Sequence, residues 1–311
     1  MSTLHSKKRF LGKFRNLINL PYQLKDFENS IKDFQNLQLL DQTKALQAAS
    51  KNPLNHFGKK CFSQTDEDGI TLEILRRMNS LSNGIYLELG VGDGMENNTL
   101  ILAALGWKGV WIGAQELLFD IKRSSEEKFQ YIKEWITLEN VAALAKRGLA
   151  NLQQDKVDVI SLDLDGNDIY LAEAMLEVGL RPKLFIVEYN GKFPPPVQFK
   201  IDYNPTHEWI GDDYFGASLT SFNTLFEKMN YKLVCCNSHT GSNAFFVERA
   251  YEHLFGDIPV ELNDLYVGPR YFLYDRHGHP PAVATVQKIM SSFNQWGSLL
   301  YKWLQTSIIP L

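Results

Sequence analysis

The sequence predicts an α/β protein with a doubly wound, mostly parallel sheet that ends in an antiparallel hairpin, and with helical extensions at both termini. From about residue 60 to residue 187, short apolar runs of strand length alternate with segments of helical spacing, which is typical of parallel strands joined by helices. The last two apolar runs are separated by a short turn that contains Gly241, which favours a hairpin. Residues 1–58 and 284–306 show helical spacing instead.

Length and composition indicate a globular chain with one central domain. Of the 311 residues, 44% are hydrophobic and 22% are charged, which excludes a disordered chain, a collagen and a coiled-coil rod. The alternating pattern occupies residues 59–249, which we expect to form the central domain. A helical extension, residues 1–58, precedes this domain, and an irregular segment with a final helix, residues 250–311, follows it.

Charge and cysteine usage exclude several classes of function. The net charge of −4 and the pI of about 6.0 give no electrostatic footprint for nucleic acid, so we expect no nucleic-acid partner. The three cysteines, Cys61, Cys235 and Cys236, lack zinc-binding spacing, and reduced thiols fit a cytoplasmic protein. Neither a signal-peptide pattern nor an apolar run of about 18 residues is present, so no transmembrane helix is predicted.

The N-terminal extension combines basic and apolar residues. Basic side chains between Lys7 and Arg15 stand among apolar ones, a pattern of helices that lie on membrane surfaces or bind partners. Pro21 is expected to split the extension into two helices, and the second carries an apolar stripe from Phe27 to Leu40. Three interpretations remain open: a peripheral membrane contact, packing on the chain's own domain, and a homo-oligomer formed through the terminal helices.

The elements follow in order from the apolar spacing. Strands are predicted at Ile85–Leu89, Gly109–Ile112, Trp135–Ile136, Val157–Leu162, Leu184–Val187, Tyr231–Cys236 and Ala244–Val247. Helices are predicted over residues 66–78, 98–105, 117–131, 139–150, 168–178, 217–229 and 284–306. Between them, the proline-rich stretch 191–205 is a loop, and 250–283 is mostly irregular.

A glycine-rich turn, Glu88-Leu89-Gly90-Val91-Gly92-Asp93-Gly94, follows the first strand. It lies at the carboxyl end of that strand, where open α/β sheets bind ligands, and glycine lets a ligand approach the backbone closely. A dinucleotide site has the motif G-x-G-x-x-G and binds negatively charged phosphates. This turn has G-x-G-x-G instead, and its acidic residues would repel phosphates. The cationic amino group of S-adenosylmethionine fits better, with Glu88 or Asp93 as its partner. A turn without a ligand is the alternative.

Carboxylates follow the fourth and fifth predicted strands. The fourth ends in Asp163-Leu164-Asp165-Gly166-Asn167-Asp168 and the fifth in Glu188-Tyr189-Asn190, so both ends should converge on one crevice. Their oxygen atoms suit Mg²⁺ or another divalent cation. The predicted metal ligands are Asp165, Asp168, Glu188 and Asn190. The competing interpretation is that the carboxylates cap the next helix and bind substrate hydroxyls.

These segments together resemble a known family. Phe62-Ser63-Gln64-Thr65-Asp66-Glu67-Asp68-Gly69, the glycine turn with Asn98-Thr99-Leu100, the Asp163–Asp168 and Glu188–Asn190 segments, Gly216-Ala217-Ser218-Leu219 and Asn243-Ala244-Phe245-Phe246-Val247 occur in the order found in FkbM-like class I S-adenosylmethionine-dependent methyltransferases. The resemblance covers about residues 60 to 248. It implies a Rossmann-like fold and O-methylation of a sugar, glycan or glycosylated small molecule.

The resemblance also implies a cofactor site. Its predicted members are Ser63, Gln64, Glu88, Gly90, Gly92, Asp93, Gly94, Asn98, Thr99, Gln115, Ile136 and Asp163. One departure stands out: Gly113 follows the second strand where the family carries an acid for the ribose hydroxyls, and Gln115 and Glu116 are the nearest substitutes. The alternative function is therefore a catalytically degenerate binding or scaffold protein, and a dinucleotide oxidoreductase ranks third.

Methyl transfer to a hydroxyl requires removal of a proton, because a sugar hydroxyl is a poor nucleophile. The candidate bases are His207 in the loop after the prolines, His239 in the terminal hairpin, and Asp165, alone or through a metal. Aromatic residues around this loop are expected to stack on a sugar face or simply to pack within it. They are Tyr189, Tyr203, Trp209 and Tyr214.

Overall fold

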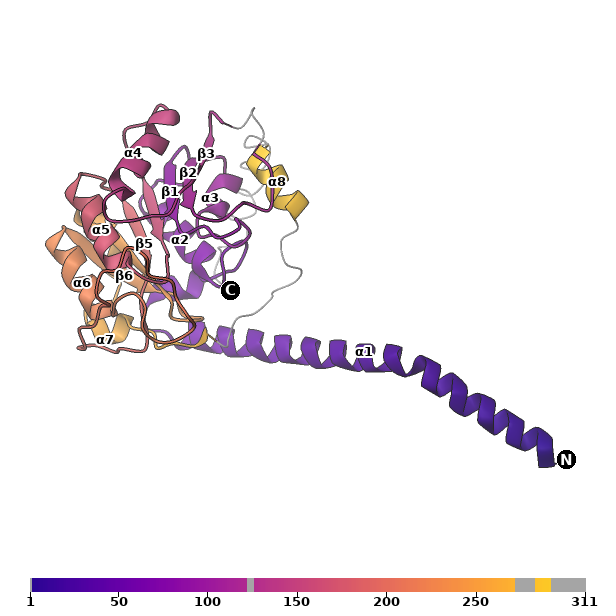
Figure 1. Ribbon diagram of the computed structural model, residues 1–311. Helices are drawn as coiled ribbons and strands as arrows, with labels where there is room; N and C mark the ends of the chain where they lie inside the picture. Colours follow the sequence, from indigo (N-terminus) through magenta and orange to yellow (C-terminus); the bar gives the residue numbers. More distant parts are fainter. Residues whose placement is uncertain (1, 122–125, 272–282, 292–311) are drawn as a thin grey trace.

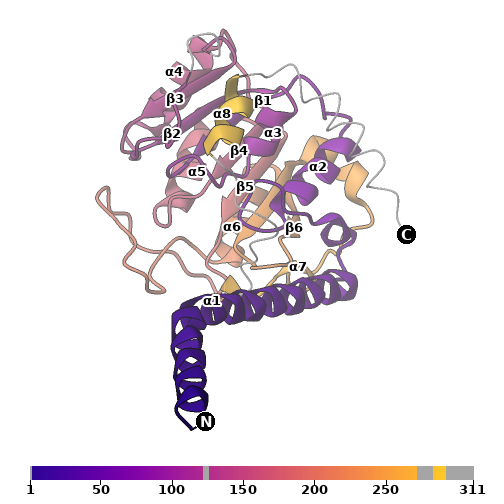
Figure 2. The same ribbon diagram turned by 90° about the vertical axis from the view of Figure 1, so that its right-hand side faces the viewer.

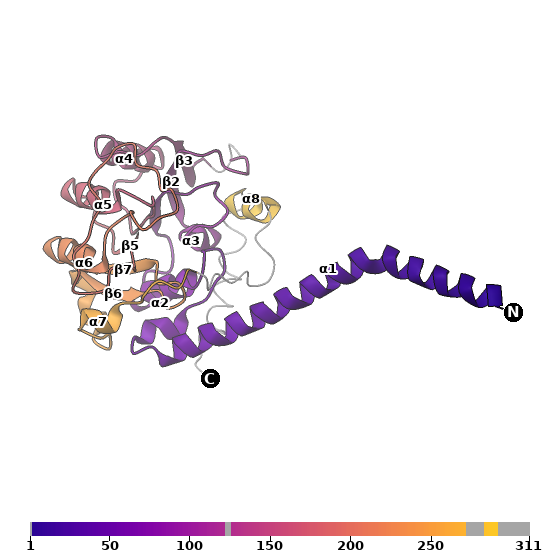
Figure 3. The ribbon, with the colours of Figure 1, turned by 60° about the horizontal axis from the view of Figure 1, so that its bottom comes forward.

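The computed structural model describes residues 2–121, 126–271 and 283–291, with residues 2–19 described as helix backbone. A seven-stranded sheet forms the centre, with helices on both faces (Figure 1). Helices α4, α5 and α6 cover one face, and α2, α3 and α8 cover the other (Figures 1 and 3). This arrangement is a Rossmann-like, doubly wound α/β fold, as the sequence predicted.

The sheet has the strand order β3-β2-β1-β4-β5-β7-β6. The first five strands pair in parallel, and β7 runs antiparallel to both β5 and β6. The strands are β1 (Ile85–Leu89), β2 (Lys108–Gly113), β3 (Phe129–Lys133), β4 (Val159–Leu162), β5 (Leu184–Glu188), β6 (Tyr231–Cys236) and β7 (Asn243–Glu248). The predicted antiparallel hairpin at the end of the sheet is confirmed.

Helices connect the strands and extend the chain at both ends. They are α1 (Ser2–Ala49), α2 (Glu67–Arg77), α3 (Leu100–Ala104), α4 (Val141–Asn151), α5 (Asp168–Glu177), α6 (Leu219–Lys228), α7 (Leu262–Leu265) and α8 (Val283–Ser291). Two 3-10 helices, η1 (Pro53–Phe57) and η3 (Arg249–Phe255), lie beside β6. The stretch 250–271 is otherwise irregular, as expected.

Burial explains why the central strands have continuous apolar runs. All five residues of β1 are buried, because helices cover both faces of a parallel strand. The register pairs Leu89 at the end of β1 with Ile112 of β2 on one side and Leu162 of β4 on the other. The residues that follow these three strands therefore start at the same edge of the sheet.

The sequence prediction is wrong between residues 117 and 131. Bends and turns occupy residues 114–121 and 126–128 in place of the predicted helix, and the third strand is Phe129–Lys133 and not Trp135–Ile136. Phe129 packs edge-on against Trp111 of β2, with 5.1 Å between ring centroids. Because β3 is an edge strand, polar residues are tolerated in it, and the pattern lacks the apolar run that marks a buried strand.

Pro21 does not divide the N-terminal extension into two helices. Helix α1 runs through 48 residues with Pro21 inside it. Figure 2 shows a bend in α1, for which a proline is the usual physical cause. The last part of α1 lies along the domain, while the rest projects away from it (Figures 1 and 3).

At the C-terminal end, α8 packs on α3 with Val286, Ile289 and Met290 buried. The predicted apolar positions beyond it, Phe293, Trp296, Leu300, Trp303 and Leu304, lie outside the described residues. Cys61, Cys235 and Cys236 are free thiols, as predicted. Among the helices that the structure describes, none is both long and apolar enough to cross a membrane.

Candidate functional site

A cavity of about 230 Å³ opens at the carboxyl edge of the sheet, above β1, β2, β3 and β4. The chain leaves β1 toward β2 on one side, while β4 lies on the other side, so this edge is a topological switch point. The lining residues are Gly90, Gly92, Gly113, Ala114, Gln115, Glu134, Trp135, Ile136, Asp163, Leu164, Asp165, Asn167, Leu171 and His207. The topology therefore places the strand-end residues at the position where open sheets bind ligands.

The glycine turn forms one wall of this cavity. Gly90 has φ +89°, and a Cβ atom there would lie 1.6 Å from the carbonyl oxygen of Asp163. Gly92 has φ +54°, and a Cβ atom there would meet nothing within 4 Å. Gly90 is thus required for the close approach of the β1 and β4 ends, whereas Gly92 leaves its backbone open to the cavity.

Glu88, at the end of β1, binds backbone N–H groups at the start of α3 and does not line the cavity. Its carboxylate is 4% exposed and accepts hydrogen bonds from the backbone N–H groups of Asn98 (2.9 Å) and Thr99 (3.1 Å), and from the Thr99 hydroxyl. Burial raises the pKa of Glu88 to about 7. Glu88, Asn98 and Thr99, which were predicted to contact the cofactor, are not among the residues that line the cavity. Glu88 instead accepts the backbone N–H groups at the start of α3.

Asp93 and Gly94 are not among the residues that line the cavity. The Asp93 carboxylate accepts a hydrogen bond from the N–H of Met95 at 3.1 Å, which fixes the turn locally. A Cβ atom at Gly94 would lie 2.9 Å from both Leu117 and Phe119. Gly94 is therefore a packing position, and neither residue takes the cofactor-contacting place predicted for it.

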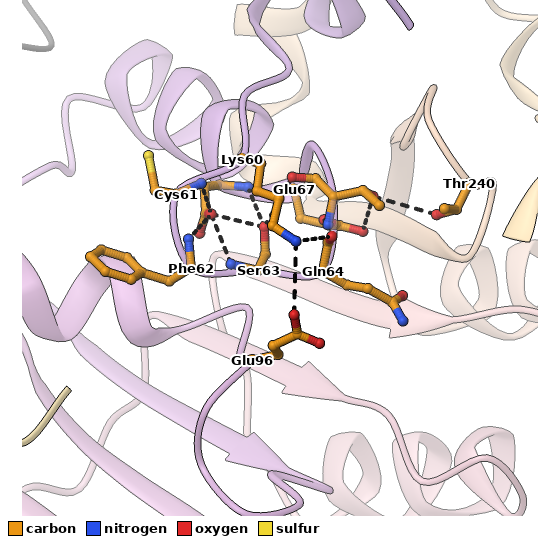
Figure 4. A network of polar contacts seen from close by, with 10 residues as sticks. Lys60, Cys61, Phe62, Ser63, Gln64, Glu67, Glu96 and Thr240 are labelled. Carbon is orange, nitrogen blue, oxygen red and sulfur yellow. Dashed lines mark hydrogen bonds and ion pairs between the residues drawn. The ribbon is translucent and has the colours of Figure 1, made fainter. Parts of the chain in front are cut away.

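Ser63 and Gln64 belong to a neighbouring polar network (Figure 4). Ser63 is buried and donates its hydroxyl to Asp68 at 2.8 Å, and Asp68 also accepts the N–H groups of Cys61, Phe62 and Ser63. Lys60 donates to the carbonyl of Gln64 at 2.8 Å and lies 3.8 Å from Glu96. This network ties the loop to the glycine turn, but neither Ser63 nor Gln64 lines the cavity as predicted.

Three carboxylates that follow or end β4 and β5 lie close together, and two of them, Asp163 and Asp165, line the cavity. One oxygen from each of Asp163, Asp165 and Glu188 lies within 4.8 Å of the others. Burial raises the pKa of Asp163 and of Glu188 well above their usual range, and the neighbouring carboxylates raise both further. The pKa of Asp165 is also raised by burial, and His207 opposes this rise. Such a cluster attracts a cation.

Asp168 and Asn190 are not part of this cluster, which corrects the predicted metal ligands. Asp168 accepts the backbone N–H groups of Leu164 (2.8 Å) and Gly166 (2.9 Å), and burial raises its pKa to about 6. The Asn190 amide donates to the carbonyls of Asp213 and Phe215 and accepts from the N–H of Lys192. Both N–H groups that Asp168 accepts belong to the loop before α5, whose N-cap makes no side-chain hydrogen bond, so Asp168 does not cap this helix as the competing interpretation expected. Both side chains instead shape loops.

Of the candidate bases, Asp165 and His207 line the cavity and His239 does not. Asp165 has φ +52°, an unusual conformation for a residue with a side chain. The buried Nε2 atom of His207 has no hydrogen-bond partner within the described part of the chain. His239 lies in another pocket, at α1, where its Nε2 atom is 2.5 Å from the Thr43 hydroxyl. His239, which was predicted as a candidate base, therefore lies apart from the cavity that Asp165 and His207 line.

The opposite side of the cavity contains a carboxylate that the sequence reasoning missed. Glu134 lies directly after β3 and lines the cavity beside Gln115 and Ile136. Glu116, the other predicted substitute for a ribose-binding acid, pairs with Lys133 instead. Because the third strand was predicted six residues too late, Glu134 was not recognised as a strand-end residue.

Comparisons with known proteins add little to this geometry. No protein-family model matches the chain, and no curated protein matches it. Among solved structures, one described as the crystal structure of cofactor-bound Rv0187 from MTB aligns with 68% of this chain and 90% of its own, at 12% identity and a TM-score of 0.35. A likeness at this level supports no conclusion about function.

Proposed function

We propose that the chain binds S-adenosylmethionine in the cavity above β1 and β4 and transfers its methyl group to a hydroxyl of a sugar, glycan or glycosylated small molecule. The observation that carries the proposal is the combination of an open glycine turn with a cluster of three carboxylates at the switch point of the sheet. The resemblance of the strand-end segments to FkbM-like methyltransferases supports the same function.

The residues present fit a cationic ligand better than a pyrophosphate. Burial raises the pKa of Asp163, Asp165 and Glu188, and repulsion from neighbouring carboxylates raises the pKa of Asp163 and of Glu188 further. A sulfonium and an ammonium group would relieve that repulsion, whereas phosphates would add to it. The backbone at Gly92 is open to the cavity and can approach the methionine part. This electrostatic pattern argues against the dinucleotide alternative.

Glu134 and Gln115 are the proposed partners of the ribose hydroxyls. Both side chains are exposed at the β2–β3 side of the cavity. The carboxylate of Glu134 would take the place of the ribose-binding acid that is absent at Gly113. The Tyr131 hydroxyl donates to the carbonyls of Gly113 and Gln115, which fixes the backbone at this position. Ile136, which is buried, and Trp135 border the adenine in this arrangement.

The cofactor supplies the reactive methyl group, and this chain's residues position the acceptor and remove its proton. Asp165 and His207 line the cavity on the side away from Glu134. The raised pKa of Asp165 suits a general base, since a carboxylate of ordinary pKa is too weak to take a proton from a hydroxyl. We assign proton removal to Asp165 and its orientation to His207.

The loop 191–215 supplies the proposed acceptor surface. Trp209 and Tyr214 are 48% and 46% exposed on this loop, and the ring of Tyr214 lies 6.4 Å from that of His207, centroid to centroid. Trp135 donates to the carbonyl of Pro205 at 2.7 Å, so the loop is attached to the cofactor side of the cavity. Exposed aromatic faces beside hydrogen-bonding groups suit the apolar face and the hydroxyls of a sugar.

A divalent cation is the second ligand that the carboxylate cluster suits. Asp163, Asp165 and Glu188 offer hard oxygen atoms close enough to share one ion. There the ion would orient an acceptor hydroxyl and lower its pKa. Methyl transfer that continues unchanged in a chelator would refute this role and leave Asp165 as the base.

Calorimetry with S-adenosylmethionine and S-adenosylhomocysteine tests the proposed cofactor. The two ligands differ by the charged sulfonium of S-adenosylmethionine. Asp163→Asn should therefore weaken binding of S-adenosylmethionine about tenfold more than binding of S-adenosylhomocysteine, a difference of about 1.4 kcal/mol. Glu134→Gln should weaken both alike, and Glu116→Gln is the matched control that should change neither. Absence of binding of either ligand at millimolar concentration would refute the proposal.

Transfer of labelled methyl to a panel of glycans and glycosides then tests the reaction. Asp165→Asn should retain cofactor affinity within a few fold and lose transfer, because it keeps the shape and removes the base. The degenerate-scaffold alternative predicts a different outcome: the cofactor binds, no acceptor is methylated, and Gly113→Glu tightens binding. A Cβ atom at Gly113 would lie 3.1 Å from Val91, so this variant requires only a small shift.

A further inference from the structure

The projecting part of α1 carries a row of exposed apolar side chains. Leu20, Leu24, Phe27, Ile31 and Phe34 are 42% to 64% exposed, although residues of this kind are usually buried. A single helix in water is held only weakly by its own hydrogen bonds. A row of this length on a helix that projects from the domain therefore indicates a partner surface.

The spacing of this row is that of a coiled coil. Successive members are separated by four, three, four and three residues, which places them at alternating a and d positions of a heptad repeat. Leu17 continues the pattern by one step toward the N-terminus. Six consecutive core positions are thus apolar, a stricter pattern than an ordinary amphipathic helix requires.

The row faces away from the chain's own domain. Near its C-terminal end, α1 contacts the domain through half-buried or buried side chains: Leu39, Leu40, Thr43, Leu46 and Gln47. These occupy the b, c and f positions of the same repeat, which lie opposite a and d. At the core positions of this stretch, Gln38, Asp41 and Ala45 are exposed. The described part of the domain therefore leaves the apolar row uncovered, and a partner can reach the row without meeting these residues.

The charges beside the apolar row, as distinct from the basic residues between Lys7 and Arg15 that precede it, favour a second copy of this chain over an anionic membrane. Lys25, Asp26, Lys32 and Asp33 occupy the outer b and c positions and balance in sign, so no basic face flanks the row. The positions beside the core hold Gln23, Glu28, Ser30 and Gln35. Two identical helices therefore meet there without pairing like charges, which a self-complementary interface requires.

We propose that two copies of this chain associate through α1 as a parallel coiled coil, with Leu20, Leu24, Phe27, Ile31 and Phe34 of each in the interface. In parallel register, the bend in α1 falls at the same height in both helices, whereas antiparallel pairing would set it against a straight segment (Figure 2). The two domains then lie on opposite sides of the helix pair, because each helix contacts its own domain through the face opposite the core.

Sedimentation equilibrium of the full chain tests the association. The wild type should have twice the mass of the 35.6 kDa chain, and the double variant Leu24→Glu, Ile31→Glu should have the mass of one chain. The matched control is Asn29→Glu, Asn36→Glu, which adds the same charges with the same spacing at the outer f positions and should remain dimeric. A monomeric wild type at all concentrations, or loss of the dimer in the control, would overturn the proposal.

Oxidative cross-linking tests the register and uses the folded protein. In a Cys61→Ser background, Leu24→Cys should form a covalent dimer on oxidation, because identical a positions are adjacent in a parallel pair. Asn29→Cys on the outer face should not. Equal cross-linking of both variants, or a wild type that stays monomeric and binds anionic phosphatidylserine vesicles through this segment, would contradict the proposed interface. Neither experiment depends on the proposed cofactor.

Discussion

The close approach of the glycine turn to the end of β4 makes two neighbouring glycines respond differently to the same substitution. Alanine at Gly90 places a Cβ atom 1.6 Å from the carbonyl oxygen of Asp163, at φ +89°. Alanine at Gly92 places it in open space, at φ +54°. Gly90→Ala therefore combines backbone strain with a clash against the main chain, and Gly92→Ala has backbone strain alone.

The expected destabilisation follows from these two terms. Left-handed backbone disfavours alanine by about 1–2 kcal/mol, and forcing an extra methyl group into packed structure adds roughly 1–3 kcal/mol. Gly90→Ala should thus lower the free energy of unfolding by about 2–5 kcal/mol and Gly92→Ala by about 1–2 kcal/mol. With roughly 2–4 °C per kcal/mol for a domain of this size, the melting temperatures should fall by about 4–20 °C and 2–8 °C.

Thermal melts and ligand titrations of the two variants measure both effects. Gly92→Ala should retain most of its stability and lose affinity for S-adenosylhomocysteine, because the new methyl group projects into the cavity. Gly90→Ala should unfold at a clearly lower temperature. If Gly90→Ala were as stable as Gly92→Ala, the turn would not approach Asp163 as described, and the placement of the carboxylate cluster beside the turn would be refuted.

Three further predictions rest on other contacts. The pKa of Glu188 is raised above its usual 4.5 in the folded protein, so the folded state holds this proton more tightly and the free energy of unfolding falls as pH rises from 4.5 through the raised pKa. Urea titrations should show that Glu188→Gln reduces this fall between pH 5 and pH 8. An equal pH dependence in the wild type and the variant would contradict the assignment. Native Cys235 and Cys236 should react with a thiol reagent only after unfolding, because both are buried and burial raises both pKa values; rapid native labelling would count against their burial. His239→Ala should leave cofactor affinity unchanged but expose the α1 junction to protease, because the bond to Thr43 is lost, and a fall in affinity would return His239 to the site.

The fold could be predicted from the sequence where the strands are buried on both faces. β1, β4 and β5 carry apolar runs because helices cover them, and the prediction placed each within two residues. The edge strand β3 carries Gln130 and Lys133 among its five residues, so its pattern does not identify a strand. Its packing against Trp111 is a long-range contact that no local spacing encodes.

The site was predictable to the extent that its residues directly follow strands. Gly90, Asp163 and Asp165 line the cavity because the topology of the sheet brings strand ends together. Glu134 was missed because its strand was misplaced. The position of His239 outside this cavity could not be predicted, because its contact with Thr43 joins residues 196 positions apart.

What separates a structural from a functional carboxylate here is the number of donors that each one meets. Glu88 accepts two backbone N–H groups and a hydroxyl, and Asp68 accepts three backbone N–H groups and the Ser63 hydroxyl. Asp163 and Glu188 instead hydrogen-bond to each other, and no backbone donor within the described ranges reaches either side chain. Two carboxylates in this relation hold a proton between them or await a cation. Asp68 keeps one buried oxygen without a partner, but its other oxygen accepts four donors, whereas Asp163 and Glu188 contact each other. This difference is best explained by a positively charged ligand.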